Sequence, residues 1–222
     1  MKNKLKNKFG FSAKEQRILL KLNSPKKIQD YIDSLEYNLE EKGETFYSPR
    51  DVMKHGKADC VESAVFAAAA LRFHGYPPLL LDITSSARDD DHVVAVFREN
   101  GCWGAIGKSK YTFLSFREPV YRTIRELAMS YFELYFNYWG EKTMRSFSRR
   151  PFNLARFDGR EWMTSEKNIF YIGTQLDKVP HEKLMARGMA RRLRRVTPLD
   201  REAGELWIRR KGLLKKLKRE GY

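Results

Sequence analysis

A cysteine and a histidine stand at the beginnings of two expected secondary-structure elements, and together they have the chemistry of a thiol enzyme. Cys60 is expected to be the first residue of an Ala-rich helix, because Asp59 is a good N-cap and Glu62 has capping-box spacing. Unpaired N–H groups and the helix dipole favour a thiolate there, so we expect a lowered thiol pKa. His92 opens the apolar run HVVAVF and is the candidate base for this nucleophile.

Both residues also have ordinary structural interpretations. Most cysteines are small buried hydrophobes, and a histidine between a loop and a strand is commonly a surface residue. Two further histidines flank the Cys60 helix in sequence. His74 lies near its far end, about 20 Å from Cys60 at about 1.5 Å per residue, too far to be the partner. His55 is a weaker rival of His92.

The segment after His92 predicts a hairpin that decides which side chains share its face. Asn100-Gly101 is a strong two-residue turn signal, and such a loop pairs residues whose numbers sum to 201. Because side chains alternate along a strand, one face then carries His92, Val94, Gly107 and Ser109. Cys102 pairs with Glu99 and lies on the opposite face, away from His92. A loop one residue longer would exchange the two faces.

The elements expected around these residues describe an α+β chain. Helical spacing and capping signals predict helices beginning at Ser12, over 25–39, over 49–55 with Gly56 at the end, over 60–74, and from 120 to 139. Apolar runs predict strands over 79–83, 92–97 and 102–106. Helices therefore come first, then an antiparallel sheet, then helices again.

Composition bounds the class of protein. The chain has 222 residues, of which 42% are hydrophobic, enough for a real core and too many for a wholly disordered chain. No apolar run approaches the roughly 20 residues of a membrane-spanning helix. Two cysteines make neither a disulfide framework nor a Cys-rich zinc module, and we recognise no secretory signal. We expect a cytoplasmic protein.

The net charge of +15 is concentrated near the C-terminus. Residues 183–222 contain 14 Lys and Arg against 4 Asp and Glu. We therefore predict a globular domain over 1–180 and a basic, helical appendage over 181–222. Such an appendage suits nucleic acid or an anionic surface, although a solvated helix docked on the body explains it equally well.

Two stretches carry a family resemblance, KADCVESAVFAAAALRFHGYPPLLLDI and DDDHVVAVFRENGCWGAIGKS. Over about residues 57–109 they resemble the transglutaminase-like superfamily of papain-related thiol enzymes, in an uncharacterised subgroup. In that pattern a Cys begins a long helix, a His opens a strand, and an Asp follows a Trp on the neighbouring strand. The resemblance implies that Cys60 is the nucleophile and His92 the base, with Trp103 as the aromatic marker. It implies a Cys-bearing helix packed on an antiparallel sheet.

The chain departs from this pattern at the third position. Four residues after Trp103, where the family has Asp, it has Gly107, which cannot orient an imidazole. Three interpretations follow. Ser109 orients His92 in a weaker site, a carboxylate from Asp82 or the 89–91 run substitutes, or the site has lost catalysis.

The resemblance implies thiol-dependent acyl transfer or hydrolysis of an amide or peptide-type bond, with a protein or peptide as substrate. Cys-His chemistry needs no metal or organic cofactor. The alternative is a catalytically degenerate fold that binds nucleic acid or another polyanion through its basic tail.

A P-loop interpretation of Gly107-Lys108-Ser109 fails, because the first glycine of that motif is missing from its position.

Overall fold

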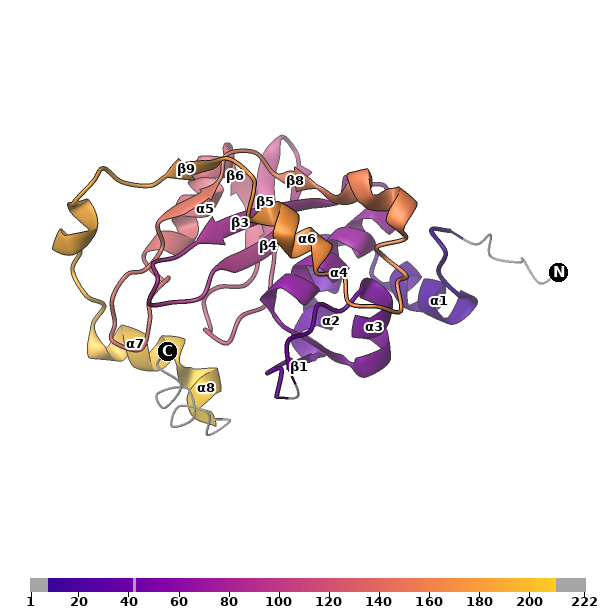
Figure 1. Cartoon of the computed structure of the whole chain (residues 1–222), viewed down its shortest axis with the longest axis horizontal. Coiled ribbons are helices and arrows are strands. Elements are labelled where there is room, and N and C mark those ends of the chain that lie inside the picture. The colour runs from indigo at the N-terminus through magenta and orange to yellow at the C-terminus, as the bar shows by residue number, and fades with distance from the viewer. Residues whose placement is uncertain (1–7, 42, 211–222) are drawn as a thin grey trace.

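The chain combines helices with an antiparallel sheet, as expected for an α+β protein (Figure 1). The computed structural model describes residues 8–41 and 43–210. Within these residues the main sheet has the strand order β6-β5-β4-β3-β7-β9, with β8 paired to β3, and every pairing is antiparallel. Its strands are β3 (Leu79–Thr84), β4 (His92–Glu99), β5 (Cys102–Ile106), β6 (Arg117–Tyr121), β7 (Ser146–Ser148), β8 (Phe152–Asn153) and β9 (His181–Lys183).

The helices divide between the two faces of this sheet, with α1 to α4 gathered on one side (Figure 1). That group contains α1 (Ala13–Lys21), α2 (Pro25–Ser34), α3 (Pro49–His55) and α4 (Cys60–Phe73). The later helices are α5 (Ile124–Phe132), α6 (Tyr171–Leu176), α7 (Pro198–Gly204) and α8 (Leu206–Arg210), with 3-10 turns at Leu154–Arg160 and Met189–Arg192. A separate parallel pair, β1 (Glu36–Tyr37) and β2 (Lys57–Ala58), joins the end of α2 to the start of α4.

Helix α4 is the centre of one hydrophobic core. Its alanines pack without a gap against the sheet, and the run from Glu62 to Leu71 is buried. The predicted capping box is present, since the Asp59 side chain accepts from the Glu62 N–H and Glu62 accepts from the Asp59 N–H. A helix buried on all sides needs no polar stripe, which explains its uniformly apolar sequence.

A second core lies on the opposite face of the sheet, where α5 packs. Val94, Val96 and Ala105 point to this face, while Val93 and Ala95 point to the α4 face. His92 alternates with Val93 and so belongs to the α5 face, whereas Cys60 comes from the α4 face. The nucleophile and base candidates therefore approach the start of β4 from different sides.

The predicted hairpin register is confirmed. Glu99 pairs with Cys102 and Ala95 with Ile106, so every paired sum is 201. Asn100 and Gly101 have φ of 50° and 80°, the left-handed conformation that this two-residue turn requires. The ladder between β4 and β5 ends at the Ala95–Ile106 pair, which leaves the beginning of β4 unpaired on that side.

Two predicted helices are too long. The helix expected over 25–39 ends at Ser34, because Glu36–Tyr37 pairs with β2 instead. The helix expected over 120–139 is preceded by β6 and ends at Phe132. Beyond it, the Asn137 Oδ1 accepts from the N–H groups of Trp139 and Glu141 and closes a tight turn.

Just after the expected boundary at 180/181, the chain re-enters the fold. Residues 181–183 form β9 and pair with β7 inside the main sheet. Farther on, Ile208 is fully buried in the α5-side core. Periodicity missed this because a three-residue edge strand is too short to show any. The last part of the predicted appendage, 211–222, lies outside the described residues. No helix among the described residues has the length and apolarity to cross a bilayer.

Candidate functional site

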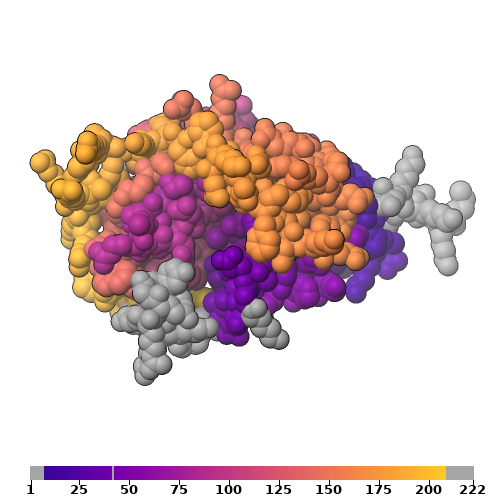
Figure 2. Space-filling model, viewed as in Figure 1, coloured from indigo at the N-terminus to yellow at the C-terminus, as the bar shows by residue number. Residues whose placement is uncertain are grey.

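Cys60 and His92 line one cavity of about 310 Å³. Its walls come from the 37–40 loop, the start of α4, the 89–92 segment, the 109–114 loop and the chain after α5. In Figure 2 the surface is hollowed where the purple segment around residues 36–60 meets the magenta one around 80–95. Residues far apart in sequence thus converge at the start of β4.

Cys60 is half-buried as the first residue of α4. The backbone N–H of Val93 donates a hydrogen bond to its sulfur, so the thiol lies at the residue next to His92. The sheet is open at this point, because the β4–β5 ladder has already ended. Cys60 at the start of α4 and His92 at the start of β4 therefore line the same cavity.

The expectation of a lowered thiol pKa is wrong. Burial raises the pKa of Cys60 above its usual value, and the charge of Asp59 raises it further, while the Val93 N–H opposes the rise. Asp59 also takes up the helix-start donors, since its carboxylate accepts from the N–H groups of Val61 and Glu62. The N-cap that starts the helix thus neutralises the effect that would have stabilised a thiolate.

The pKa of the Asp59 carboxyl is also shifted, and the charge of this carboxylate works against ionisation of the Cys60 thiol. Burial first, and then the charge of Glu62, raises the pKa of Asp59 to about 8. Its carboxylate is therefore charged above about pH 8, the range in which the thiol would lose its proton. At neutral pH Cys60 is a thiol and not a thiolate.

His92 is 3% exposed, and its imidazole is neutral at physiological pH. Burial lowers the pKa of His92 to about 4, and the positive charge of Arg117 lowers it too, while a hydrogen bond to the Leu114 backbone opposes them. The rings of Tyr131 and Tyr135 pack edge-on against the imidazole with centroids 6.3 and 6.4 Å away. The resting pair is therefore a neutral thiol with a neutral base.

The unpartnered nitrogen of His92 faces the position of the missing carboxylate. Among the described residues, the buried Nε2 of His92 has no hydrogen-bond partner. A Cβ built on Gly107 would lie 3.7 Å from this nitrogen and 2.8 Å from the Cγ1 of Val94. Position 107 is thus next to the imidazole as the hairpin register predicted, and the glycine offers the nitrogen no side-chain partner.

Gly107 is held in place by α2. The buried Gln29 side chain donates to the Gly107 carbonyl over 2.9 Å and accepts from its N–H over 3.1 Å. The next residue, Lys108, donates to the carbonyls of Ile32 and Leu35 at the end of α2. These four bonds fix the backbone beside His92, and no pattern in the sequence pointed to them.

The structure places the other expected orienting groups elsewhere. Ser109 lines the same cavity, but its hydroxyl accepts from the Tyr111 N–H. The Asp82 carboxylate lies 3.3 Å from the Nε2 of His181, on the α4 side of the sheet. The 89–91 carboxylates bond to Thr143, Lys110 and the Ser85 N–H respectively. None of these groups is a hydrogen-bond partner of the His92 Nε2.

Acidic side chains dominate the lining of the cavity, which residue-by-residue inspection of the sequence missed. Five acidic residues line it, Glu40, Asp59, Asp89, Asp90 and Asp91. Among the described lining residues the one lysine is Lys110, whose Nζ lies 2.6 Å from the Asp90 carboxylate. Burial raises the pKa of Asp89 to about 6. The acidic run directly before His92 was the sequence signal for this acidic lining. The sequence did not show which other residues would lie near that run in space.

A buried carboxylate anchors one wall of the cavity to α4. Glu62 is fully buried and accepts from Asn38, Thr45, the Tyr47 N–H and the Asp59 N–H at 2.7 to 3.0 Å. These four donors tie the 38–47 loop to the turn that carries Cys60. Glu62 was predicted only as a capping residue, and its larger role depends on a loop far away in sequence.

No protein-family model matches this chain, and no curated protein is significantly similar to it in sequence. Among the described residues, no group of three His, Cys, Asp or Glu side chains is arranged to hold a metal ion.

Proposed function

We propose that the cavity is a thiol site for acyl transfer or hydrolysis at an amide or peptide-type bond, in a transglutaminase-like fold. The observation that carries this proposal is the joint lining of one cavity by Cys60 and His92, with the Val93 N–H on the sulfur. The sequence resemblance over about residues 57–109 supports the same assignment. Both groups are neutral, so the base must act during attack and not before it.

In the proposed reaction the Cys60 sulfur attacks the acyl carbon while the His92 imidazole takes the thiol proton. The S–C bond forms, the bond to the leaving group breaks, and the imidazolium returns that proton to the departing amine or alkoxide. Water or an amine then attacks the thioester, and its proton passes through His92 to the sulfur. The Cys60 N–H is the helix-start donor that Asp59 does not occupy, and we assign it to the developing oxyanion.

The experiment is acylation by a p-nitrophenyl ester, followed by release of p-nitrophenolate and by intact mass. We expect one acyl group on Cys60, with Cys60→Ala unlabelled and Cys102→Ala labelled like the unmodified chain. His92→Gln should slow acylation at least about tenfold, the lower range for loss of a general base. If neither Cys60→Ala nor His92→Gln changes the acylation, the proposal is refuted.

The pH dependence of acylation follows from the neutral imidazole. His92 acts as a base only when unprotonated, so the rate should be level above about pH 5 and fall as pH approaches its pKa of about 4. Papain-like sites with a preformed ion pair would respond differently to pH, because they lose activity when their thiolate is protonated. A rate that rises only above pH 8 would contradict the role of His92.

The alternative function is a binding module without catalysis, and the unpartnered Nε2 beside Gly107 is the observation that favours it. In that case the exposed basic residues of the predicted tail, among them Arg191 and Arg194, engage a polyanion. Removal of 183–222 is not a clean test, because Ile208 belongs to the core. Arg191→Gln with Arg194→Gln lowers the charge without removing buried residues.

A further inference from the structure

A second concave site lies away from Cys60, between the β7–β8 turn and the end of α6. It is a groove of about 570 Å³. The Arg149 N–H donates to the Pro180 carbonyl over 2.8 Å, so the two sides of the groove are joined at its base. Four cations line it, Arg149, Arg150, Arg156 and Lys178, and no carboxylate is among the described residues that do.

Three of these four cations are available to a ligand. Arg149, Arg150 and Lys178 are exposed, and none of them has an ion-pair partner within the part of the chain that the structure describes. Arg156 lies over the ring of Phe152, another lining residue, with its guanidinium carbon 4.7 Å from the centroid.

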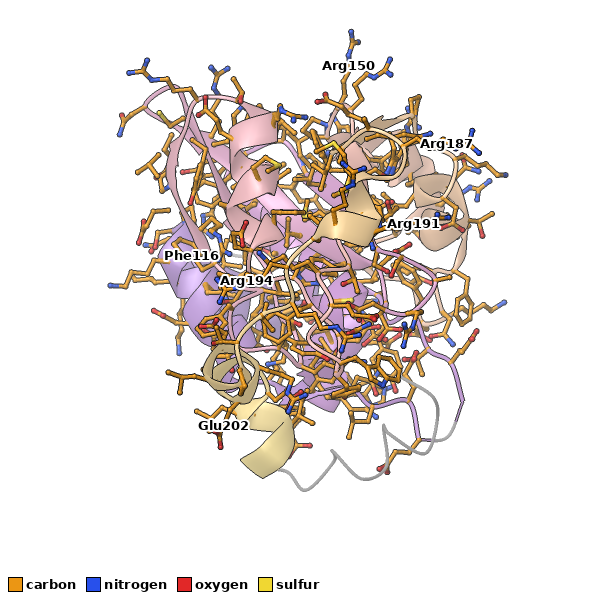
Figure 3. All side chains as sticks on the ribbon, turned by 90° about the vertical axis from the view of Figure 1, so that its left-hand side faces the viewer. Phe116, Arg150, Arg187, Arg191, Arg194 and Glu202 are labelled. Carbon is orange, nitrogen blue, oxygen red and sulfur yellow. The ribbon has the colours of Figure 1, made fainter. Side chains whose placement is uncertain are left out.

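Of the carboxylates near the groove, two are paired elsewhere, whereas Asp177, next to Lys178, is exposed and forms no ion pair with a described residue. Asp158 forms an ion pair with Arg72, and Glu182 lies 2.5 Å from Arg125. Against Asp177, the four lining cations leave the groove with a net positive charge. Exposed arginines continue beyond it, since Arg150 projects from the top in Figure 3 and three arginines of the 187–194 segment follow below.

We propose that this groove binds the phosphate backbone of a single-stranded nucleic acid. Three of the four lining cations are arginines, whose planar guanidinium matches phosphate oxygens in a bidentate geometry. A recessed groove admits an extended strand, whereas a duplex presents a convex and rigid surface. The exposed large apolar side chains of the described residues lie outside the groove, which disfavours insertion into a membrane.

The inference does not rest on the proposed thiol chemistry. Its test is fluorescence anisotropy with a labelled single-stranded DNA of about 16 nucleotides, a length that spans a typical binding groove. We expect Arg149→Glu with Arg150→Glu to weaken binding at least about tenfold. The same double variant should reduce the slope of log affinity against log salt by about 1.4, the loss of two single-strand phosphate contacts.

The matched control is Arg17→Glu with Lys26→Glu, which makes the same charge change at exposed positions on α1 and α2. We expect its affinity to stay within about twofold of the unmodified chain, apart from the general effect of net charge. Cys60→Ala should bind the DNA unchanged.

Four outcomes would overturn the proposal. The unmodified chain binds no DNA, the groove and control variants weaken equally, binding goes to anionic phospholipid vesicles and not to DNA, or Arg191→Gln with Arg194→Gln abolishes binding while the groove variant keeps it. The last result would place the polyanion site on the basic tail.

Discussion

The Cys60 cavity and the arginine groove carry opposite charge on one strongly basic chain. Five acidic residues and one lysine line the cavity, whereas four cations and no described acidic residue line the groove. Several groups of the cavity, Asp59, Asp89 and His92 among them, have pKa values shifted by burial, whereas the four cations of the groove are exposed. Net charge is therefore a poor guide to what each site attracts, because the local arrangement of charges sets the local potential.

The two regions also differ in how they are supported. Groups around Cys60 are held by buried hydrogen bonds, such as those of Glu62 and Gln29. The groove is held mainly by its backbone, since β7 pairs with β9, β8 pairs with β3, and the Arg149 N–H donates to the Pro180 carbonyl. We expect single substitutions to damage the cavity through the fold, and those in the groove to act through charge alone.

The largest expected effect is that a variant at either site loses the activity of that site and keeps the activity of the other. Cys60→Ala should abolish acylation by the p-nitrophenyl ester and leave DNA affinity within about twofold. The groove variant, Arg149→Glu with Arg150→Glu, should keep the acylation rate and lose DNA binding as described above. Parallel measurement of both activities on both variants checks this, and coupled losses would mean that the regions are not independent.

Glu62→Ala should lower the free energy of unfolding by about 3 to 5 kcal/mol, because four buried or partly buried donors lose a fully buried acceptor. Urea denaturation followed by circular dichroism measures the change. Glu44→Ala is the control, because Glu44 is exposed in the same loop and should cost less than about 0.5 kcal/mol. If both variants lower the free energy of unfolding equally, Glu62 does not anchor the cavity wall.

Gly107→Asp with Val94→Ala should increase acylation at least about tenfold, since a carboxylate beside Nε2 stabilises the imidazolium that forms during attack. The second change removes the Cγ1 that lies 2.8 Å from the new Cβ. It should cost about 2 kcal/mol of stability. The carboxylate should also raise the pKa of His92, so the acid limb of the rate profile moves to higher pH.

Gly107→Asn with Val94→Ala is the matched control, because it has the same shape without the charge. If the Asp and Asn variants acylate at equal rates, the missing carboxylate does not limit this site.

The smallest effect is expected from Asp59→Asn, which keeps an N-cap acceptor and removes its negative charge. The pKa of the Cys60 thiol should fall toward its ordinary value, although burial still holds it high. Alkylation by iodoacetamide near pH 9 should accelerate severalfold. Asp51→Asn, on α3 outside the cavity, should leave the rate unchanged, and a slower reaction of Asp59→Asn would contradict the charge argument.

Local signals predicted the parts of this fold that depend on near neighbours. The Asp59–Glu62 capping box, the αL glycine at 56 and the 100–101 turn are all present where expected. The turn also predicted contacts between more distant residues. A two-residue loop determines the register of the whole hairpin and hence places Gly107 beside His92. Helix lengths were less predictable, because strand pairing and the Asn137 turn ended helices that propensity alone would extend.

Sequence by itself determined which residues begin α4 and β4 and which face of the hairpin carries His92, since capping, turn type and alternation act over a few residues. Only the tertiary structure decided the protonation of Cys60, the unpartnered nitrogen of His92, the entry of β9 into the sheet, and the segregation of charge. Those properties depend on burial and on groups brought together from distant segments, and electrostatic energies in a poorly solvated interior are set by such neighbours.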